Sequence, residues 1–346
     1  MSPSAAGQQA LRFGVIGIGN IVNSAIAPAM LADDSCELVA VTSRDQSRAE
    51  SFAAEFGAGF ATTEYQSMLE RPDVDAVFIA TPNAFHAEQV IVAARAGKHV
   101  LCDKPLAMNV PEALAAVEAC SQAGVELGIN FHNRPLAWVN DTRTMISDGR
   151  VCDVEVIEAH VGSGPRVYTN WRADPSVAGL GSVHNVGVHV LDVFGFILDS
   201  EPVEVTALFD QQPSSGKVEM LAMILIRFDN GTLGYLNCNE RLSYPQNTLT
   251  VYGSSGRIVA ENLTRASAGG VLRHLTSDGE TAVSYPAQKA YQICLADFAA
   301  AVLGGSRPSA SAIDGLRSVV VCDAIARSVR ERQPIEIALT TLPSGG

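Results

Sequence analysis

Positive charge and long apolar runs are both scarce in this sequence of 346 residues. Lys and Arg number 24 against 37 Asp and Glu, which gives a formal net charge of −13. Nucleic acid is bound by a dense basic surface, so this deficit argues against a nucleic-acid partner. We find no run near the roughly 18 apolar residues of a membrane helix, and the N-terminus lacks the basic patch and apolar core of a secretory signal. We therefore expect a cytoplasmic protein without a membrane partner.

Paired cysteines are also lacking. The seven cysteines are an odd number, they are scattered, and none forms a Cys-x-x-Cys motif. This pattern predicts neither a disulfide framework nor a zinc cluster, and we assign no metal site. By contrast, 47% of the residues are hydrophobic, which is enough to build full-sized cores and excludes a disordered chain. At about 100–200 residues per domain, the length indicates two domains.

Up to about residue 130, short apolar strands alternate with helical segments. The predicted strands are 11–16, 38–42, 74–80, 99–102 and 125–129, and the predicted helices include 46–56, 84–95 and 111–123. Strands separated in this way by helices imply a parallel sheet with crossover connections. Residues 1–130 are therefore predicted to form an α/β, Rossmann-type dinucleotide-binding domain.

After Phe131 the predicted strands become longer and follow one another directly. They are 154–161, 203–210, 219–228, 232–239 and 247–252, with helices at 136–147, 185–198, 288–303 and 312–330. The Asp229-Asn230-Gly231 turn between two apolar runs indicates a hairpin. Residues 131–346 are thus predicted to form an α+β domain with a large, open, mostly antiparallel sheet that binds substrate and mediates oligomerisation.

A glycine-containing loop follows the first predicted strand. In Gly17-Ile18-Gly19-Asn20-Ile21-Val22, the two glycines permit a tight turn and the close approach of a pyrophosphate, which backbone N–H groups at the helix start would then face. Val22 replaces the usual third glycine, a position that mainly sets helix–strand packing. We assign Gly17, Gly19, Asn20 and Ile21 to cofactor binding. An ordinary strand–helix turn is the alternative.

The end of the second predicted strand bears on the choice of cofactor. An acidic residue there would hold the ribose 2′-hydroxyl of NAD, but this sequence has Ser43 and Arg44. A hydroxyl followed by a guanidinium suits the 2′-phosphate of NADP. We therefore expect NADP. Two alternatives stay open: Arg44 is a solvated surface residue and Asp45 caps the next helix, or Asp45 binds the ribose and the cofactor is NAD.

Lys104 ends a predicted strand within Asp103-Lys104-Pro105. The carboxyl end of a strand is where ligands bind in an open parallel sheet. A lysine at this place can donate a hydrogen bond to a substrate hydroxyl or to the nicotinamide amide. Asp103 would then be a salt-bridge partner or an acid neighbour whose pKa the lysine lowers.

A second group of polar residues lies between Gly179 and Asp192. If a helix begins near Asn185, the i, i+4, i+7 spacing places Asn185, His189 and Asp192 on one face. A histidine can accept or return the proton of a hydroxyl during hydride transfer. A lone histidine in an apolar helix is more often a core residue, and we expect His184 to be one.

Together these motifs resemble the Gfo/Idh/MocA oxidoreductases, whose namesakes are glucose–fructose oxidoreductase and inositol dehydrogenase. The resemblance spans residues 11–337. Its markers are Gly17-Ile18-Gly19, Ala80-Thr81-Pro82-Asn83 with His86, Ala96-Gly97-Lys98-His99-Val100, Asp103-Lys104-Pro105, Trp171-Arg172 and Asn185-x-Gly-x-His189-x-x-Asp192. The family combines a dinucleotide-binding domain with an open-faced sheet domain, and it typically oxidises or reduces sugars and cyclitols.

The resemblance implies roles for individual residues. Asp103-Lys104-Pro105 matches the family's Glu-Lys-Pro motif, so the catalytic lysine carries over to Lys104 and the catalytic histidine to His189. Many members have an aspartate where this chain has Asn185. The family's Thr-Pro-Asn-x-x-His stretch lies beside the cofactor, which implies that contribution for Thr81, Pro82, Asn83 and His86. A turn or helix cap is an additional function open to Asn83.

The sequence thus predicts an NADP-dependent oxidoreductase that transfers a hydride between nicotinamide and a carbinol or carbonyl carbon of a sugar, anhydro-sugar or cyclitol. His189 is the expected acid–base group, Lys104 polarises the reacting oxygen, and Asn185, which does not titrate, orients the substrate. The residues expected to line the sugar site with them are Arg134, Trp171 and Arg172, although core packing is an alternative for Trp171. An exposed face of the second sheet would favour a homodimer or homotetramer.

Two other functions are compatible with the same fold. One is a regulator that binds a dinucleotide or sugar without turnover, which the missing acid at Asn185 suggests. The other is a dihydrodiol or biliverdin reductase. The presence of both Lys104 and His189 favours an enzyme over a regulator.

Overall fold

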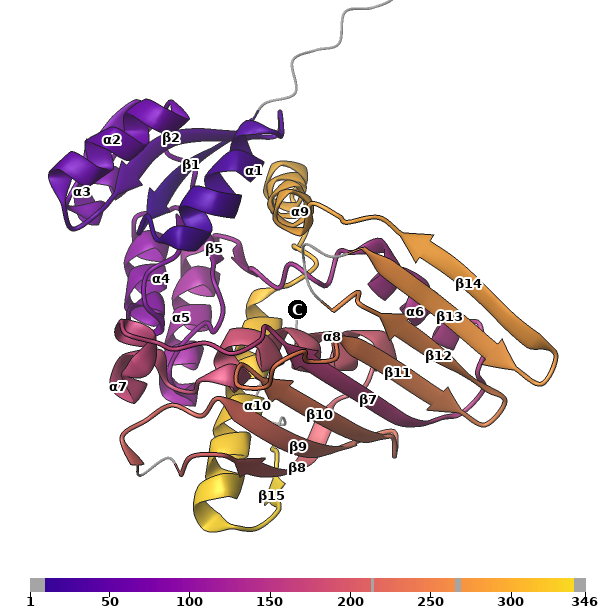
Figure 1. The fold of residues 1–346 in the computed structure, drawn as a ribbon. Coiled ribbons are helices and arrows are strands. Elements are labelled where there is room, and N and C mark those ends of the chain that lie inside the picture. Colours follow the sequence, from indigo (N-terminus) through magenta and orange to yellow (C-terminus); the bar gives the residue numbers. More distant parts are fainter. Residues whose placement is uncertain (1–9, 213–214, 265–268, 339–346) are drawn as a thin grey trace, which may run out of the picture.

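The computed structural model describes residues 10–212, 215–264 and 269–338. The first part of the chain, indigo to purple in Figure 1, forms sheet A. Its six parallel strands lie in the order β3-β2-β1-β4-β5-β6. Its strands are β1 (Leu11–Ile16), β2 (Cys36–Thr42), β3 (Phe60–Thr62), β4 (Ala76–Ile79), β5 (His99–Cys102) and β6 (Leu127–Ile129). The predicted Rossmann-type sheet is confirmed. The order reverses between β1 and β4, which is where ligands bind in such sheets.

Helices cover both faces of sheet A because successive side chains of its strands point to opposite sides. On β4, Ala76 and Phe78 enter one core while Val77 and Ile79 enter the other. The helices of this part are α1 (Ala27–Leu31), α2 (Gln46–Phe56), α3 (Tyr65–Leu69), α4 (His86–Arg95) and α5 (Val110–Ala123). The short elements β3 and α3 were not predicted.

Sheet B has nine strands in the order β14-β13-β12-β11-β7-β10-β9-β8-β15. Its strands are β7 (Val154–Gly162), β8 (Pro202–Phe209), β9 (Leu221–Phe228), β10 (Leu233–Asn239), β11 (Thr248–Gly253), β12 (Gly256–Glu261), β13 (Gly270–Thr276), β14 (Gly279–Tyr285) and β15 (Ile335–Glu336). Only β7 and β10 pair in parallel, so the mostly antiparallel sheet is confirmed. The strands β12 to β15 were not predicted.

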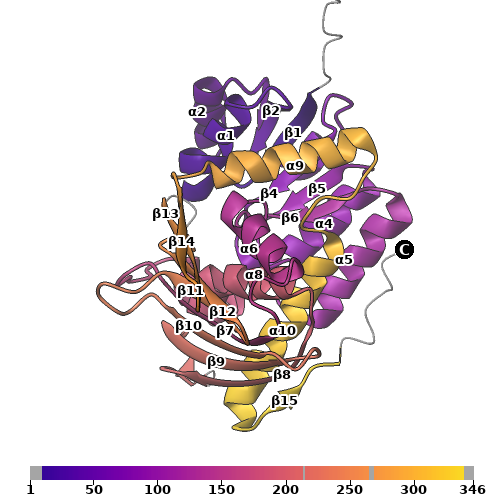
Figure 2. The same ribbon diagram turned by 90° about the vertical axis from the view of Figure 1, so that its right-hand side faces the viewer.

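One face of sheet B carries helices and the other faces outward (Figure 2). The covering helices are α6 (Ala137–Ser147), α8 (Val188–Leu198) and α10 (Ala312–Glu331). Along β9, Ile224 and Ile226 are buried beneath them, while Met223 and Leu225 alternate to the exposed face. This two-sided pattern is usual for an antiparallel sheet, except that several outward residues are apolar.

The chain returns to sheet A near its end. Helix α9 (Ala290–Gly304) crosses sheet A (Figure 2), and the Phe298 ring lies 6.1 Å from that of Phe13. A Cβ on Gly128 would come within 2.7 Å of the Phe298 ring, so glycine makes room for this packing. Helix α10 then contacts both α5 and β8. We still propose that the chain divides into two domains at residue 130. Helix α9 belongs to the second of these in sequence but packs on sheet A of the first.

The segment Pro175–Leu198 is long and apolar enough to cross a membrane by length and composition alone. In the structure, 67% of its apolar window is buried inside the protein. The segment includes α8, whose apolar side chains Val193, Phe194 and Ile197 lie in the main core. Its hydrophobicity is therefore accounted for by packing within the fold.

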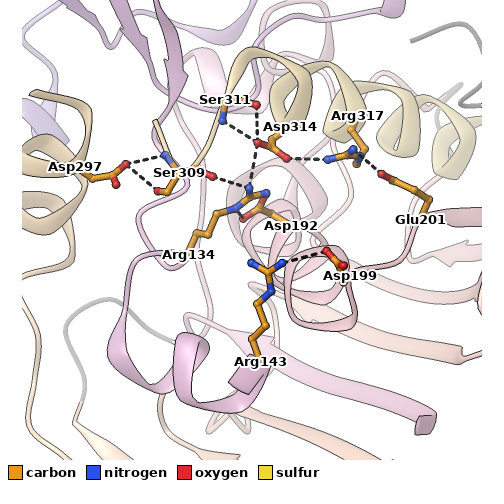
Figure 3. Close-up of polar contacts among 10 residues, drawn as sticks. All are labelled: Arg134, Arg143, Asp192, Asp199, Glu201, Asp297, Ser309, Ser311, Asp314 and Arg317. Atoms are coloured by element: carbon orange, nitrogen blue, oxygen red, sulfur yellow. Dashed lines mark hydrogen bonds and ion pairs between the residues drawn. The ribbon is translucent and has the colours of Figure 1, made fainter. Parts of the chain in front are cut away.

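A buried ion-pair network connects the loop before α6 with α8 and α10 (Figure 3). The Arg134 guanidinium forms a bidentate pair with Asp192, and its Nη1 lies 3.1 Å from Asp314 Oδ2. The side chains of Arg134 and Asp192 are 8% and 3% exposed. Burial raises the pKa of Asp192 even with Arg134 in contact. One guanidinium thus joins three segments that lie far apart in sequence, and Arg317 is a second cationic partner of Asp314 at 2.7 Å.

Removing that guanidinium should destabilise the fold strongly. Arg134→Ala leaves a buried carboxylate without its partner, and we expect a loss of about 3–5 kcal/mol. Arg143→Ala is the matched control, because Arg143 pairs with an Asp199 side chain that is 86% exposed, and it should cost about 1 kcal/mol or less. Urea unfolding of both variants measures the difference. Equal losses would contradict the importance assigned to the buried network.

Candidate active site

The cavities that contain most of the predicted site residues lie between the carboxyl ends of the sheet A strands and the helices on sheet B. The larger has a volume of about 730 Å³, and a smaller one adjoins it on the side of the glycine loop. Residues that line both are Asn20, Ile21, Asp103, Lys104, Tyr168, Arg172 and Asn185. The two cavities therefore form one continuous site.

The glycine loop supplies one wall of the smaller cavity. Gly17 has φ +91°, and a Cβ there would lie 3.1 Å from the Ala80 carbonyl oxygen, so this tight turn requires glycine. A Cβ on Gly19 would meet nothing within 4 Å, because Gly19 faces the open cavity. A helical segment starts directly after it at Asn20. An open glycine before a helix start fits the pyrophosphate of a dinucleotide.

Ser43 and Arg44 lie away from these walls, at the start of the connection from β2 to α2. Arg44 is exposed, and neither residue lines either cavity. Asp45 caps α2, with its carboxylate accepting from the Arg48 backbone N–H at 3.0 Å. Sequence reasoning missed Arg48, whose Nη2 donates to the Ile18 carbonyl at 2.6 Å. A second guanidinium is thereby held beside the glycine loop.

Two residues of the Thr81-Pro82-Asn83 segment reach the site. Thr81 and Asn83 line the smaller cavity, and the buried Asn83 amide donates to the Ala178 carbonyl at 2.8 Å. Asn83 thus joins the two halves of the protein rather than capping a helix through its side chain. His86 lies behind the cavity, with ring nitrogens 2.8 Å from the Thr81 carbonyl and 2.7 Å from that of Pro105. Pro82 lines neither cavity.

Lys104 lies at the centre of the site. Its Nζ donates to the carbonyls of His184 and Asn185 at 3.0 and 2.9 Å. Burial lowers the pKa of Lys104, while the carboxylates of Asp103 and Glu240 act in the opposite direction. The Asp103 carboxylate also accepts from the backbone N–H of Lys104. The ammonium is therefore fixed in position and faces a cavity where it can polarise a substrate oxygen.

The helix that carries Asn185 and His189 begins with a π-helical turn, η4 (Val183–Gly187), followed by α8. Such turns often occur at functional sites. Asn185 and His189 both line the larger cavity, as their spacing predicted. The prediction that Asp192 shares their face is wrong: its carboxylate pairs with Arg134 and lines a separate cavity of about 390 Å³. The π-helical turn departs from the 3.6-residue period on which the i, i+4, i+7 expectation rests.

Arg134, which the sequence assigned to the sugar site, is likewise in that separate cavity. Its guanidinium is engaged by Asp192 and Asp314 and so is not brought together with Lys104. Trp171 and Arg172 do line the smaller cavity, with the guanidinium 4.3 Å from the centroid of the indole ring. Trp171 is half-buried there rather than packed in the core.

His189 presents one edge of its ring to the larger cavity. Its Nδ1 is buried and has no hydrogen-bond partner among the described residues, which leaves Nε2 as the nitrogen that faces the cavity. The His132 ring packs 4.3 Å away. Burial, reinforced by His132 and Lys104, lowers the pKa of His189 well below its ordinary value of 6.5. The neutral imidazole can accept a proton from a hydroxyl.

His184 is buried beside these residues. Its Nδ1 lies 3.1 Å from the Ala178 carbonyl, and burial lowers its pKa to about 4. It therefore has the buried surroundings that the sequence predicted, although it also touches the smaller cavity.

Sequence reasoning missed Tyr168 and Glu240. The Tyr168 hydroxyl donates to Glu240, and the Asn185 Nδ2 donates to both, at 2.8 Å to Tyr168 and 2.6 Å to Glu240. Tyr168 lies in an irregular loop just before Trp171. Glu240 directly follows β10, and its side chain is fully buried. An acid directly after a strand, where its side chain can reach the site at the strand end, is the sequence signal that could have pointed to it.

The chain matches two family models in sequence. The model described as "Oxidoreductase family, NAD-binding Rossmann fold" covers residues 11–131, and that of the "GFO/IDH/MocA C-terminal domain" covers residues 139–259. The chain therefore belongs to the Gfo/Idh/MocA oxidoreductases, as the motifs indicated. Its Rossmann sheet and the site at the strand ends are those of an NAD(P)-dependent, hydride-transferring enzyme.

Individual relatives align over nearly the whole chain. A 1,5-anhydro-D-fructose reductase from Ensifer adhaerens is 31% identical over 329 residues, which are 94% of this chain and 98% of the relative. An inositol 2-dehydrogenase from Rhizobium meliloti is 30% identical over 344 residues, covering 95% and 99%. The 3-ketoreductase KijD10 from Actinomadura kijaniata, solved with NADP and TDP-benzene, has a TM-score of 0.83 at 28% identity and covers 92% and 98%.

The two glycines of the loop should respond differently to the same substitution. Gly17→Ala adds a Cβ where φ is positive and the Ala80 carbonyl is close, so it should cost about 1–3 kcal/mol of stability. Gly19→Ala adds a Cβ into open space. Its stability should change by about 0.5 kcal/mol or less, while cofactor affinity falls about tenfold or more. Thermal unfolding and cofactor titration measure the two effects, and full cofactor affinity in Gly19→Ala would refute the phosphate assignment.

Proposed function

We propose that this protein is an NADP-dependent oxidoreductase that acts on a neutral cyclic sugar, anhydro-sugar or cyclitol at a CH–OH group or the corresponding ketone. The observation that carries the proposal is the convergence of Lys104, Asn185 and His189 on one cavity beside the glycine loop. The relatives named as an anhydro-sugar reductase and an inositol dehydrogenase support the substrate class.

In the direction of oxidation, each residue has a distinct task. Lys104 holds the reacting oxygen through its fixed ammonium and stabilises negative charge as the hydroxyl loses its proton. His189 Nε2 accepts that proton, because burial keeps the imidazole neutral. Asn185 orients the ring by hydrogen bonds. The bound nicotinamide supplies the hydride acceptor, and the carbinol carbon becomes a carbonyl. Reduction reverses these roles, with His189 returning the proton.

NADP is the proposed cofactor, with the phosphate loop of Gly17, Gly19, Asn20 and Ile21 at its pyrophosphate. Thr81 and Asn83 would lie beside it, with His86 holding the Thr81 carbonyl from behind, and Pro82 joins Thr81 to Asn83 in the chain. Ser43 and Arg44 stand at the end of β2, where they would meet a 2′-phosphate, and Arg48 holds the glycine loop through the Ile18 carbonyl. The NADP-bound relative KijD10 supports this choice.

We also propose a cytoplasmic homo-oligomer, a dimer or tetramer. All seven cysteines lie in the described part of the chain and are free thiols, which suits a reducing compartment. The outward face of sheet B carries large apolar side chains, with Leu208 72% and Leu225 57% exposed. Leu208 pairs with Met223 across the strands, so these residues form a patch that a second copy would cover.

Turnover tests the proposed chemistry. Lys104→Ala and His189→Ala should each lower kcat by about 100-fold or more, while cofactor affinity survives in the histidine variant.

Because burial lowers the pKa of His189, the acid limb of the parent's oxidation profile should lie below pH 6.5. The assay follows reduced-nicotinamide absorbance with a panel of pyranoses, anhydro-sugars and inositols. Turnover of an aromatic dihydrodiol or a hydroxy acid alone would refute the substrate class, and no turnover at all would favour a regulator.

Cofactor affinity tests the proposed phosphate contact. Arg44→Ala should weaken NADP binding by about 10- to 150-fold, the range for a hydrogen bond to a charged group, and leave NAD binding nearly unchanged. Arg48→Ala is the control, because loss of its contact with the Ile18 carbonyl should weaken both cofactors. Equal effects of Arg44→Ala on the two cofactors would show that Arg44 does not read the 2′-phosphate.

A further inference from the structure

Glu240 is a buried carboxylate whose oxygens are surrounded by donors. Oε1 accepts from Ser163 Oγ at 2.8 Å and Asn185 Nδ2 at 2.6 Å, and it lies 3.3 Å from Arg166 Nε. Oε2 accepts from the Tyr168 hydroxyl. The side chain is 0% exposed. A carboxylate so enclosed has little freedom to rotate, and it fixes the orientation of every group that donates to it.

That orientation decides what Asn185 presents to the cavity. An ionised carboxylate only accepts hydrogen bonds, so the amide must turn its NH2 toward Glu240. The Asn185 Oδ1 is then directed away from Glu240. Because Asn185 lines both cavities, this oxygen is the side-chain atom that is left for a ligand. The single proton of the Tyr168 hydroxyl is likewise directed to Glu240, and its oxygen accepts from Asn185. Both side chains therefore offer acceptors, not donors, to a ligand.

We propose that Glu240 is a positioning residue that sets Asn185 and Tyr168 as a pair of acceptors, so that the site selects a substrate by a hydroxyl that donates to them. This inference rests on the proposed function and narrows it: the ring must carry a free hydroxyl near the reacting carbon. An analogue in which that hydroxyl is O-methylated or removed lacks the donor. It would cover the two half-buried acceptors without pairing them, and sites built on such hydrogen bonds reject the analogue strongly.

The same contact explains why an amide stands at position 185. A second carboxylate there would lie against that of Glu240, and two like charges in contact disfavour each other's ionised form. Positions 185 and 240 can therefore hold one carboxylate and one amide, but not two carboxylates. Exchanging the two should restore a similar arrangement, because the carboxylate would then accept from the amide in the opposite direction.

A double-mutant cycle tests the proposal. Asn185→Asp and Glu240→Gln should each lower kcat/KM by about 10- to 150-fold, mainly through KM, with cofactor affinity unchanged. In the double variant Asn185→Asp/Glu240→Gln, kcat/KM should be at least about tenfold higher than in either single variant.

The parent's kcat/KM should also be about tenfold or more lower on the O-methyl or deoxy analogue than on the substrate, and Glu240→Gln should weaken this preference. The proposal fails if Glu240→Gln keeps full kcat/KM, or if the folded double variant is no better than the single variants.

A readout without turnover separates this inference from the proposed activity. In protein labelled with [15N]asparagine, the side-chain NH2 signal of Asn185, assigned by its loss in Asn185→Asp, should be shifted by the carboxylate and protected from exchange. Both properties should disappear in Glu240→Gln. If they do while no sugar is turned over, the proposed substrate class is wrong and the positioning by Glu240 stands. If the signal is unchanged in Glu240→Gln, the contact is absent and the inference is overturned.

Discussion

The hydrogen bonds of the Lys104 ammonium hold the site together. They connect the end of β5 in sheet A with the carbonyls of η4 on sheet B. The turn is fixed from its other side by Glu219, whose carboxylate accepts from the backbone N–H groups of Gly181 and Val183 at 2.7 and 2.9 Å. Burial raises the pKa of Glu219 to about 7. The position of Asn185 therefore depends on Lys104, which binds its backbone carbonyl, and on Glu219, and that of His189 one turn later depends on the same turn.

The sequence predicted the fold well where the hydrophobic pattern was unambiguous. The strand 11–16 and the helix 46–56 agree with β1 and α2, since apolar runs and a capping aspartate determine them locally. The strands β13 and β14 escaped prediction because all their side chains except that of Leu272 are half-buried or exposed, which makes the pattern weak. The packing of α9 on sheet A also escaped, because no local pattern tells which of two sheets an apolar helix will join.

For the candidate site too, the sequence indicated some residues and misplaced or missed others. Thr81, assigned from the family resemblance, and Lys104, assigned from its strand end, line the same cavity because parallel-sheet topology brings strand ends together. Arg134 was misplaced because a buried guanidinium goes to its acidic partners, which lie far away in sequence at Asp192 and Asp314. Glu240 was missed because its partners, too, lie far from it in sequence. Its importance comes from the amide and hydroxyl that it holds, and their spacing from it in sequence follows no rule.

The crossing of α9 over sheet A limits how this enzyme can be taken apart. Phe298 fills the space left by Gly128, and Leu295 and Ala299 share one core with Phe13. A fragment ending near residue 130 would expose this core to solvent and would lack one wall of its own sheet. Chimaeras that exchange the cofactor half between relatives should therefore carry residues 290–304 along with the first 130, so that the transferred unit is discontinuous in the gene but continuous in space.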